Sequence, residues 1–197
     1  MLIEHRGKRP DIAASALISS TAVVSGDVTI AHGVRVLHGA IITAEDGAIH
    51  IGENTVVMEN AVIRGRESHP VAIGRDVMIG PHSHINGATI GDEAFIATGA
   101  SLFPGAVIGD GAEVRINAVV QVNTVVDAGL VVPIAWVAVG NPAQLFSPDR
   151  HDEIWAVQRT LDFVGTVYGI KLGDGMPAIM RKQSDWLGSH ANDSEVE

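Results

Sequence analysis

The chain contains no cysteine and few aromatic residues, and both absences restrict what it can be. Without cysteine in its 197 residues, it has no disulfide framework, no thiolate metal site and no cysteine nucleophile, as is typical of a reducing cytoplasm. Aromatic residues make up only 4% of the sequence, although 46% of it is hydrophobic. Small and branched aliphatic side chains must therefore fill the core, which indicates a narrow interior.

The chain also lacks an excess of positive charge and a long apolar run. Its formal net charge is −10 and its pI is about 5.2, which argues against binding to nucleic-acid phosphates. No apolar run reaches the roughly 20 residues that cross a bilayer. Residues 1–10 are charged and unlike a signal region. We therefore expect a cytoplasmic protein that binds neither nucleic acid nor membranes.

What the sequence does contain is an aliphatic residue at every sixth position over more than half of its length. Self-similarity at a short fixed period indicates a solenoid, and a hexapeptide period is typical of a parallel β-helix. Each hexapeptide forms one side of a triangular prism, and neighbouring coils bury each other's faces. This pattern predicts an all-β solenoid over residues 12–146. The repeated positions are Ile18, Val24, Ile30, Val36, Ile42, Ile51, Val57, Ile63, Ile73, Ile79, Ile85, Ile90, Ile96, Leu102, Ile108, Val114, Val120, Val126 and Val132.

The segments outside the repeat have a different pattern. Residues 1–11 form a lead-in to the solenoid. Ser147 and Pro148 are typical of a helix start, and apolar residues then recur at spacings of three and four. We therefore predict one amphipathic helix within residues 147–172, packed on the prism. Residues 173–197 are predicted to form an irregular acidic tail.

The six-residue period is interrupted at three places, within residues 42–51, 63–73 and 85–90. If successive hexapeptides occupy successive sides of the prism, all three interruptions fall at the same corner. Surface loops tolerate length changes at small cost, so the interruptions alone do not establish a site. Because they stack on one edge, however, we expect this corner to form the rim of a pocket.

Several motifs resemble those of the γ-class carbonic anhydrases and their relatives. The resemblance covers about residues 11–150 and implies a left-handed β-helix that assembles as a homotrimer. Hexapeptide acyltransferases share the prism and the exit motif, whereas the register of the loops favours the carbonic anhydrase branch. The motifs are the segments 40–43, 49–52, 59–63, 79–80, 91–92, 97–100 and 140–143.

In that family, zinc lies between subunits on three histidines, but the matching positions here are Arg64, Pro81 and Asn86. Zinc prefers imidazole, thiolate or carboxylate ligands, whereas a guanidinium does not deprotonate and proline offers no donor atom. We therefore expect no zinc at this site and no ordinary carbon dioxide hydration. The family's neighbouring arginine and aspartate correspond to Thr43 and Glu45.

Polar residues nevertheless occupy the place of the zinc ligands. Arg64 and Asn86 stack on one edge of the prism, and Glu59, Asn60 and His82 stack on another. In a trimer like that of the family, these edges meet between subunits. Arg64 would then hold an anionic group in a bidentate manner, Asn86 and Asn60 would also bind it, and Glu59 or His82 would move a proton. Alternatively, Arg64 and Glu59 of neighbouring chains form an interface clamp.

His82 and His84 lie two residues apart, a spacing that can indicate a metal site. Ser83 occupies the inward position between them, so both histidines are expected to point outward. Two ligands do not complete a site, and a relocated metal centre would require a third ligand. We therefore assign His84 to the binding residues of the cleft and give His190 no role.

Three functions remain open from the sequence. The first is a trimeric protein of the γ-carbonic-anhydrase type that has lost the zinc triad and binds or processes a small anionic metabolite. The second is a coenzyme A-dependent acyltransferase in which His82 or His84 is the base. The third is a trimeric scaffold without catalysis. No cofactor is assigned, except coenzyme A under the second alternative.

Overall fold

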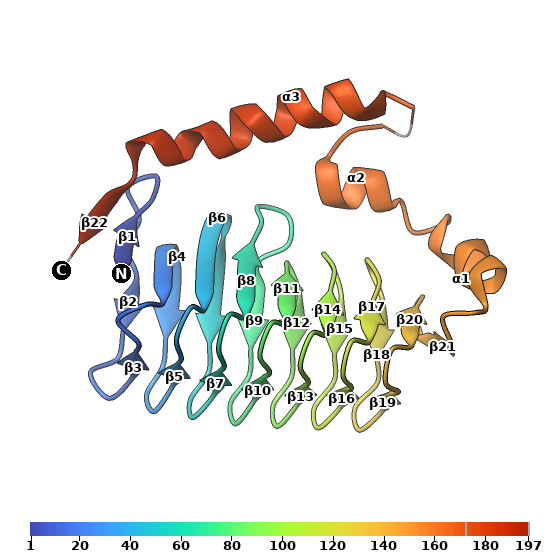
Figure 1. Ribbon diagram of the computed structural model, residues 1–197, viewed down its shortest axis with the longest axis horizontal. Helices are drawn as coiled ribbons and strands as arrows, with labels where there is room; N and C mark the ends of the chain where they lie inside the picture. Colours follow the sequence, from blue (N-terminus) through green and yellow to red (C-terminus); the bar gives the residue numbers. More distant parts are fainter. Residues whose placement is uncertain (172, 197) are drawn as a thin grey trace.

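The computed structural model describes residues 1–171 and 173–196 and contains a parallel β-helix over most of this length (Figure 1). Short strands stack coil upon coil into flat faces that enclose an aliphatic core. The predicted solenoid of hexapeptide repeats is confirmed.

The first and second faces share two long strands that bend around a corner of the prism, β4 and β6. The first face consists of β4 (Val23–Ile30), β6 (Ile41–Ile51), β8 (Val62–Gly65), β11 (His84–Asn86), β14 (Ser101–Leu102), β17 (Val119–Val120) and β20 (Val137–Val139). The second face consists of β2 (Asp11–Ile12), the later parts of β4 and β6, β9 (Val71–Ile73), β12 (Thr89–Ile90), β15 (Val107–Ile108) and β18 (Val125–Val126).

The third face is a separate seven-stranded sheet. Its strands are β3 (Leu17–Ile18), β5 (Arg35–Val36), β7 (Val56–Val57), β10 (Met78–Ile79), β13 (Phe95–Ile96), β16 (Glu113–Val114) and β19 (Val131–Val132). All neighbouring strands of this sheet are parallel.

The aliphatic residue of each hexapeptide points into the prism. Every one of the repeated positions is buried except Ile18, in the first coil, which is half-buried. Small polar residues also face inward, and their hydroxyls are satisfied by the backbone: Ser83 Oγ donates to the carbonyl of Gly80 at 2.8 Å. Burial of apolar area at roughly 25 cal/mol per Å² therefore accumulates coil by coil.

The first face is capped at both ends by additional strands. At the N-terminal end, β1 (Leu2–Glu4) pairs with β4, and β22 (Ser194–Val196) pairs antiparallel with β1. At the other end, β21 (Gln144–Phe146) pairs antiparallel with β20. These pairings protect the edges of the sheet from further strand addition. The two chain termini consequently lie side by side (Figure 1).

The helix predicted within residues 147–172 is divided into two. α1 (His151–Gln158) and α2 (Phe163–Tyr168) are separated at Asp162, which has a left-handed backbone with a φ of 47°. Its side chain accepts a hydrogen bond from the Gly165 amide and so caps α2. The break between α1 and α2 could not be predicted from the sequence, because the apolar spacing of three and four residues continues across it.

Residues 173–197 also differ from the irregular tail that we expected. α3 (Gly175–Leu187) and η1 (Gly188–Asn192) run back along one edge of the prism and lead into β22 (Figure 1). The polar composition suggested a solvated segment, but it gave no information about the backbone pairing with β1. Residues 172 and 197, at the ends of the expected helix and tail, lie outside the described part of the chain.

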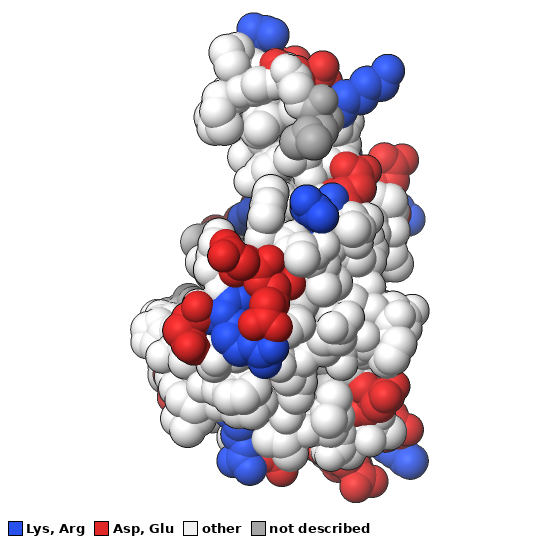
Figure 2. Space-filling model, turned by 90° about the vertical axis from the view of Figure 1, so that its right-hand side faces the viewer, with Lys and Arg blue, Asp and Glu red and all other residues white. Residues whose placement is uncertain are grey.

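Figure 2 shows the end of the molecule where α1 lies. Acidic and basic side chains lie next to one another there, as in the ion pair of Arg150 with Glu153, and no extended basic surface is visible on this face. None of the described helices has the length and apolar character needed to cross a bilayer.

Candidate functional site

The three interruptions of the period meet at the corner between the first and second faces, as predicted. β6 continues around this corner, pairing with β8 on one side and with β9 on the other. In the next coil, residues 66–69 form a small loop closed by a bridge between Arg66 and His69. α3 runs above these loops (Figure 1).

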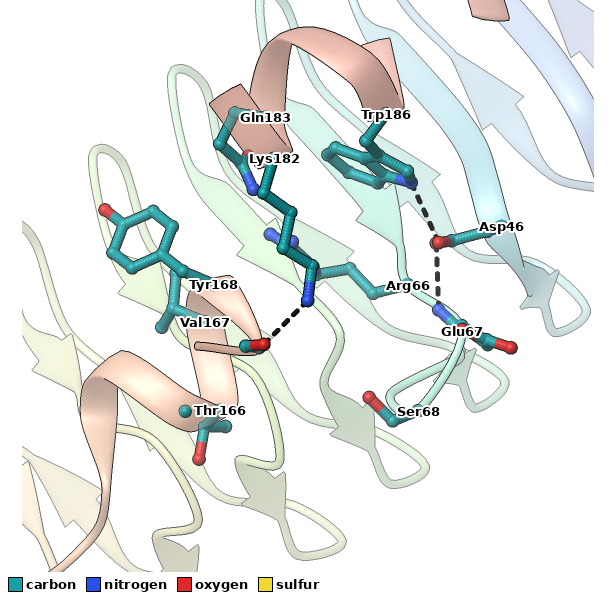
Figure 3. A pocket seen from close by; sticks show the side chains of 12 residues that line it. Asp46, Arg66, Glu67, Ser68, Thr166, Val167, Tyr168, Lys182, Gln183 and Trp186 are labelled. Atoms are coloured by element: carbon teal, nitrogen blue, oxygen red, sulfur yellow. Dashed lines mark hydrogen bonds between the residues drawn. The ribbon is translucent and has the colours of Figure 1, made fainter. Parts of the chain in front are cut away.

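A cavity of about 150 Å³ lies between this corner and the helices α2 and α3 (Figure 3). Trp186 of α3 donates from its indole nitrogen to Asp46 Oδ2 at 2.8 Å, and the guanidinium of Arg66 lies 4.7 Å from the centre of the Trp186 ring. Lys182 of the same helix donates to the carbonyl of Gly169 at 2.7 Å. The corner is thus covered by the chain's own C-terminal helix.

Four polar residues lie in register on successive coils of the first face, and we call them the polar ladder: Ser25, Thr43, Arg64 and Asn86. Each directly follows an inward aliphatic residue. The polar atoms Ser25 Oγ, Thr43 Oγ1, Arg64 Nε and Asn86 Oδ1 are all buried, and none forms a hydrogen bond with the described residues. Such atoms are rare in folded proteins.

Glu45 lies beside the polar ladder, and its side chain is only 3% exposed. Arg64 Nε is 3.5 Å from Glu45 Oε1, which is an ion pair without a hydrogen bond. His190 of η1 approaches from the other side, with its Nε2 at 2.7 Å from Glu45 Oε2. A buried carboxylate is tolerated when charges of the opposite sign compensate it, as they do here.

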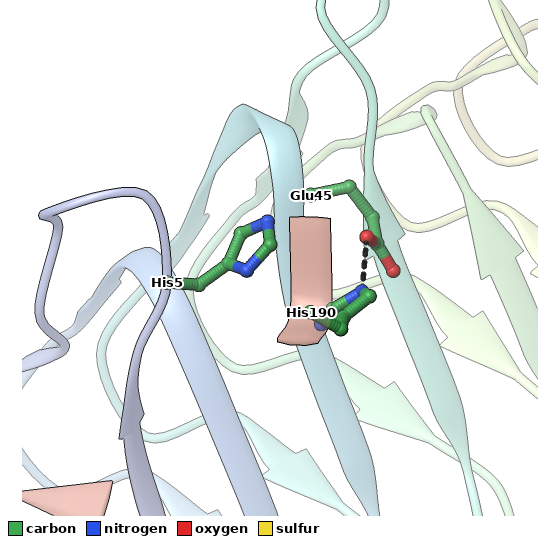
Figure 4. Close-up of side chains that lie close together, drawn as sticks. All are labelled: His5, Glu45 and His190. Carbon is green, nitrogen blue, oxygen red and sulfur yellow. Dashed lines mark hydrogen bonds and ion pairs between the residues drawn. The ribbon is translucent and has the colours of Figure 1, made fainter. Parts of the chain in front are cut away.

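His190 belongs to a compact cluster with His5, Glu45 and Asp193, of which Figure 4 draws His5, Glu45 and His190. The Nδ1 atoms of His5 and His190 lie 2.6 Å and 2.8 Å from the two carboxylate oxygens of Asp193. Because a carboxylate only accepts, both ring nitrogens donate. The two imidazole rings stack with their centres 4.4 Å apart. We call His5, Glu45, His190 and Asp193 the histidine–carboxylate cluster.

The pKa values of this cluster follow from its hydrogen bonds. Burial alone would lower the pKa of His190, but the hydrogen bonds to Asp193 and Glu45 raise it overall. Burial alone would raise the pKa of Asp193, but the hydrogen bonds from His190 and His5 lower it overall. The cluster therefore favours an imidazolium between two carboxylates.

The residues predicted from the sequence are divided between two corners. Arg64 and Asn86 pair in register, as expected. Glu59, Asn60 and His82 lie in turns at the corner between the third and first faces, where the His82 amide donates to the carbonyl of Glu59 at 3.0 Å. A single chain therefore does not bring Glu59 or His82 to Arg64.

His84 is half-buried on the first face, two residues before Asn86. Burial lowers the pKa of its imidazole, and the nearby charge of Arg64 lowers it further. His82 is exposed at its turn. The expectation that Ser83 faces inward between the two histidines is confirmed.

Sequence reasoning did not find His5, His190 and Asp193. The sequence gives no reason to assign His190 a role, because the cleft is inferred from the repeat and the C-terminal segment lies outside it. His5 and Asp193 lie 188 positions apart in the sequence and meet only because β22 pairs with β1.

Solved structures of hexapeptide-repeat proteins share this fold. A Bacillus cereus protein solved as a proposed acetyltransferase matches with a TM-score of 0.58 and 19% identity, over 93% of this chain and 95% of that one. A hexapeptide transferase family protein from Anaplasma phagocytophilum matches with a TM-score of 0.54 and 21% identity, over 93% and 97% of the two chains. The chain therefore has the left-handed β-helix fold of the hexapeptide-repeat proteins. At these identities, the likeness shows the fold alone.

The sequence is similar to γ carbonic anhydrases over about half of its length, which confirms the predicted resemblance. Gamma carbonic anhydrase 1 of Arabidopsis thaliana mitochondria is 31% identical over 101 residues, which is 48% of this chain and 37% of that protein. Gamma carbonic anhydrase 3 of the same organism is 30% identical over 100 residues, covering 48% and 39%.

An uncharacterized protein of Dictyostelium discoideum is 38% identical over 68 residues, covering 32% of this chain and 28% of that protein. The hexapeptide-repeat chain thus spans well under half the length of the curated relatives that it matches. No family model matches the chain.

Proposed function

We propose that this hexapeptide-repeat protein is a homotrimer that binds a small anionic metabolite at the polar ladder. One observation carries the proposal: Thr43, Arg64 and Asn86 stand in register, and each has a buried polar atom without a partner among the described residues. A buried polar group without a hydrogen bond costs about 1–3 kcal/mol. A ligand that bonds to all three would remove this cost.

The unpartnered atoms restrict the chemistry of the ligand. Arg64 Nε donates, and a carboxylate is the anion that a guanidinium holds best in a bidentate manner. Asn86 Oδ1 accepts, so it requires a hydroxyl or another donor on the ligand. Thr43 Oγ1 can do either. The side chain of Arg64 is 34% exposed as a whole, although its Nε atom is buried. These requirements favour a small hydroxycarboxylate.

Zinc does not fit the positions at which the resemblance implies it. Arg64 and Asn86 lie in register on adjacent coils, and neither a guanidinium nor an amide is among the usual zinc ligands. The guanidinium is a cation itself, and Pro81 has no donor atom. We therefore assign zinc no role at these positions, and the proposed function does not include ordinary carbon dioxide hydration there.

The trimer would supply the remaining polar residues. Glu59, Asn60 and His82 lie at another corner of the same chain, so only a second copy can bring them to Arg64. There, Asn60 would contribute to binding, and Glu59 or His82 would accept a proton from the ligand's hydroxyl. His84, on the first face beside Asn86, would line the same cleft.

A thermal-shift experiment with glycolate and acetyl-coenzyme A, together with native mass measurement, tests this function. The variants are Arg64→Ala and, as control, Arg75→Ala, which removes an arginine that is 64% exposed and paired with Asp92 elsewhere on the prism. We expect glycolate to raise the Tm of the wild type and of the control but not that of Arg64→Ala, with a trimeric mass throughout.

The other outcomes overturn the proposal in distinct ways. An unchanged glycolate response in Arg64→Ala would remove the polar ladder as the anion site. A loss of the trimer in that variant, without any glycolate response in the wild type, would support the interface clamp. A response to acetyl-coenzyme A alone would support acyl transfer, and no response to either compound would support the scaffold.

A further inference from the structure

We infer that His5, Glu45 and His190 form a binding site for one divalent transition-metal ion, with zinc as the best chemical match. The site differs from the positions where the resemblance implies zinc, and it adjoins the proposed anion site, because Arg64 Nε lies 3.5 Å from Glu45 Oε1. It is assembled from three distant parts of the sequence: the turn after β1, the corner of β6, and η1. The side chains converge in Figure 4.

The ligand atoms are close enough to share an ion. One donor atom from each of the three residues lies within 4.8 Å of the other two. Zinc–nitrogen and zinc–oxygen bonds are about 2.0–2.2 Å long, so the ligand atoms of a tetrahedral site lie roughly 3.3 Å from one another. The three side chains therefore need only a small inward movement, which is within the range of side-chain rotations.

The donor set is also chemically suitable. Two imidazoles and one carboxylate are a known ligand set for zinc in which the fourth position remains open. His5 is only 2% exposed, and its Nε2 has no hydrogen-bond partner among the described residues. The Nδ1 atom of the same ring is already bonded to Asp193, so Nε2 is the free ligand atom. A bound metal would satisfy it.

Asp193 orients both histidines in the way that metal sites require. Its two oxygens accept from His5 Nδ1 and His190 Nδ1, which leaves each Nε2 as the metal-binding atom. A carboxylate that holds the second nitrogen of a metal-bound histidine is a common feature of zinc sites. Asp193 is thus a positioning residue, and its role differs from that of the three ligands.

The exchange of a proton for a metal ion is balanced in charge and atoms. His190 Nε2–H now donates to Glu45 Oε2 at 2.7 Å. On metal binding, this proton leaves to solvent, and the lone pairs of His190 Nε2 and of Glu45 form bonds to the ion. The two positive charges of a divalent cation then balance the two negative charges of the Glu45 and Asp193 carboxylates. The single positive charge of the imidazolium balances only one of them.

The ion also has a route to the site. A cavity of about 350 Å³ at the N-terminal end of the corner is lined by His5 and Glu45, together with Asp27 and Glu67. Asp27, Asp46 and Glu67 make the entrance attractive to cations, although Arg6 and Lys8 also line it. The open fourth position would accept water or a ligand from this cavity.

The test is a titration of metal-free protein with Zn²⁺ by calorimetry and with Co²⁺ by visible absorption. We expect about one ion per chain and a tetrahedral Co²⁺ spectrum. His5→Gln, His190→Gln and Glu45→Gln should each weaken binding by at least about tenfold. Asp193→Asn should weaken it by roughly 10–100-fold, as is usual when a carboxylate that holds a metal-bound histidine is removed. Circular dichroism of each variant checks that the β-helix is intact.

Two control variants make the outcome specific. His84→Gln alters a histidine of the other candidate metal pair, and His151→Gln alters an exposed histidine of α1. Both should bind metal like the wild type. The inference is overturned if the wild type binds no ion or if His5→Gln and His190→Gln bind it normally. Because the glycolate response depends on Arg64 and metal binding on His5 and His190, failure of either proposal can be told from failure of the other.

Discussion

At the scale of the residue, the alternation of inward and outward side chains determines what each position contributes. Ile79 is fully buried in the prism, whereas its neighbour Met78 is 38% exposed on the outer side of the same strand. The polar ladder follows the same rule, since each of its residues comes directly after an inward aliphatic residue. Arg64 and Asn86 could be placed together from the sequence, because each follows an inward aliphatic residue and the interruption at residues 63–73 was assigned to a corner of the prism.

Removing the inward side chain should destabilise the protein far more than removing its outward neighbour. Ile79→Ala leaves a cavity between coils and should lower the free energy of unfolding by about 2–5 kcal/mol. Met78→Ala is the matched control and should cost much less, because its side chain already contacts solvent. Urea unfolding of both variants provides the comparison, and equal losses would contradict the inward register.

His84 should make the protein less stable in mild acid. Burial, followed by the charge of Arg64, lowers the pKa of this imidazole in the folded chain. The unfolded chain takes up a proton near pH 6.5, whereas the folded chain does so only at lower pH. The free energy of unfolding therefore decreases as the pH falls below about 6.5.

Accordingly, His84→Gln should lose less stability than the wild type between pH 7 and pH 5. Urea unfolding at several pH values measures this difference, and His151→Gln, at an exposed histidine, is the control. If the wild type and His84→Gln lose stability in parallel, the depressed pKa is not present.

At the scale of the element, the strands could be predicted from the sequence but the path of the C-terminal helices could not. The hexapeptide period specifies each strand by local pattern. In contrast, α3 contains no buried residue, and its apolar residues Met176, Met180 and Leu187 are exposed, so the apolar pattern does not mark the surface on which it packs. Its position depends on a few specific contacts, of which those of Trp186 with Asp46 and Arg66 are examples. The histidine–carboxylate cluster depends on the same packing and was missed for the same reason.

Trp186→Ala should therefore release α3 while leaving the β-helix folded. The substitution removes the indole that bonds to Asp46 and lies under the guanidinium of Arg66. Hydrogen exchange of the α3 amides should become at least about tenfold faster, with the strands unchanged, because local opening has its own free energy.

Asp185→Ala, on an exposed position of the same helix, is the control and should exchange like the wild type. Unchanged protection of α3 in Trp186→Ala would mean that other contacts hold the helix. Faster exchange throughout the strands would mean that the helix is required for the solenoid itself.

At the scale of the whole molecule, a prism assembled coil by coil places sites on its edges and leaves its interior filled. Arg64 lies on one edge and Glu59 on another, so the proposed catalytic arrangement requires more than one copy of the chain. The histidine–carboxylate cluster is complete within one copy, because the chain's two ends meet there. The proposed anion site therefore requires a trimer, whereas the proposed metal site requires only one copy of the chain.

A crystal structure of the assembled protein grown with glycolate would show directly whether the polar ladder binds a small anion. We expect a trimer in which the glycolate carboxylate accepts from Arg64 Nε and its hydroxyl donates to Asn86 Oδ1. It would be contradicted if side chains of a neighbouring subunit bonded these atoms and no glycolate were bound, because the polar ladder would then be a subunit interface.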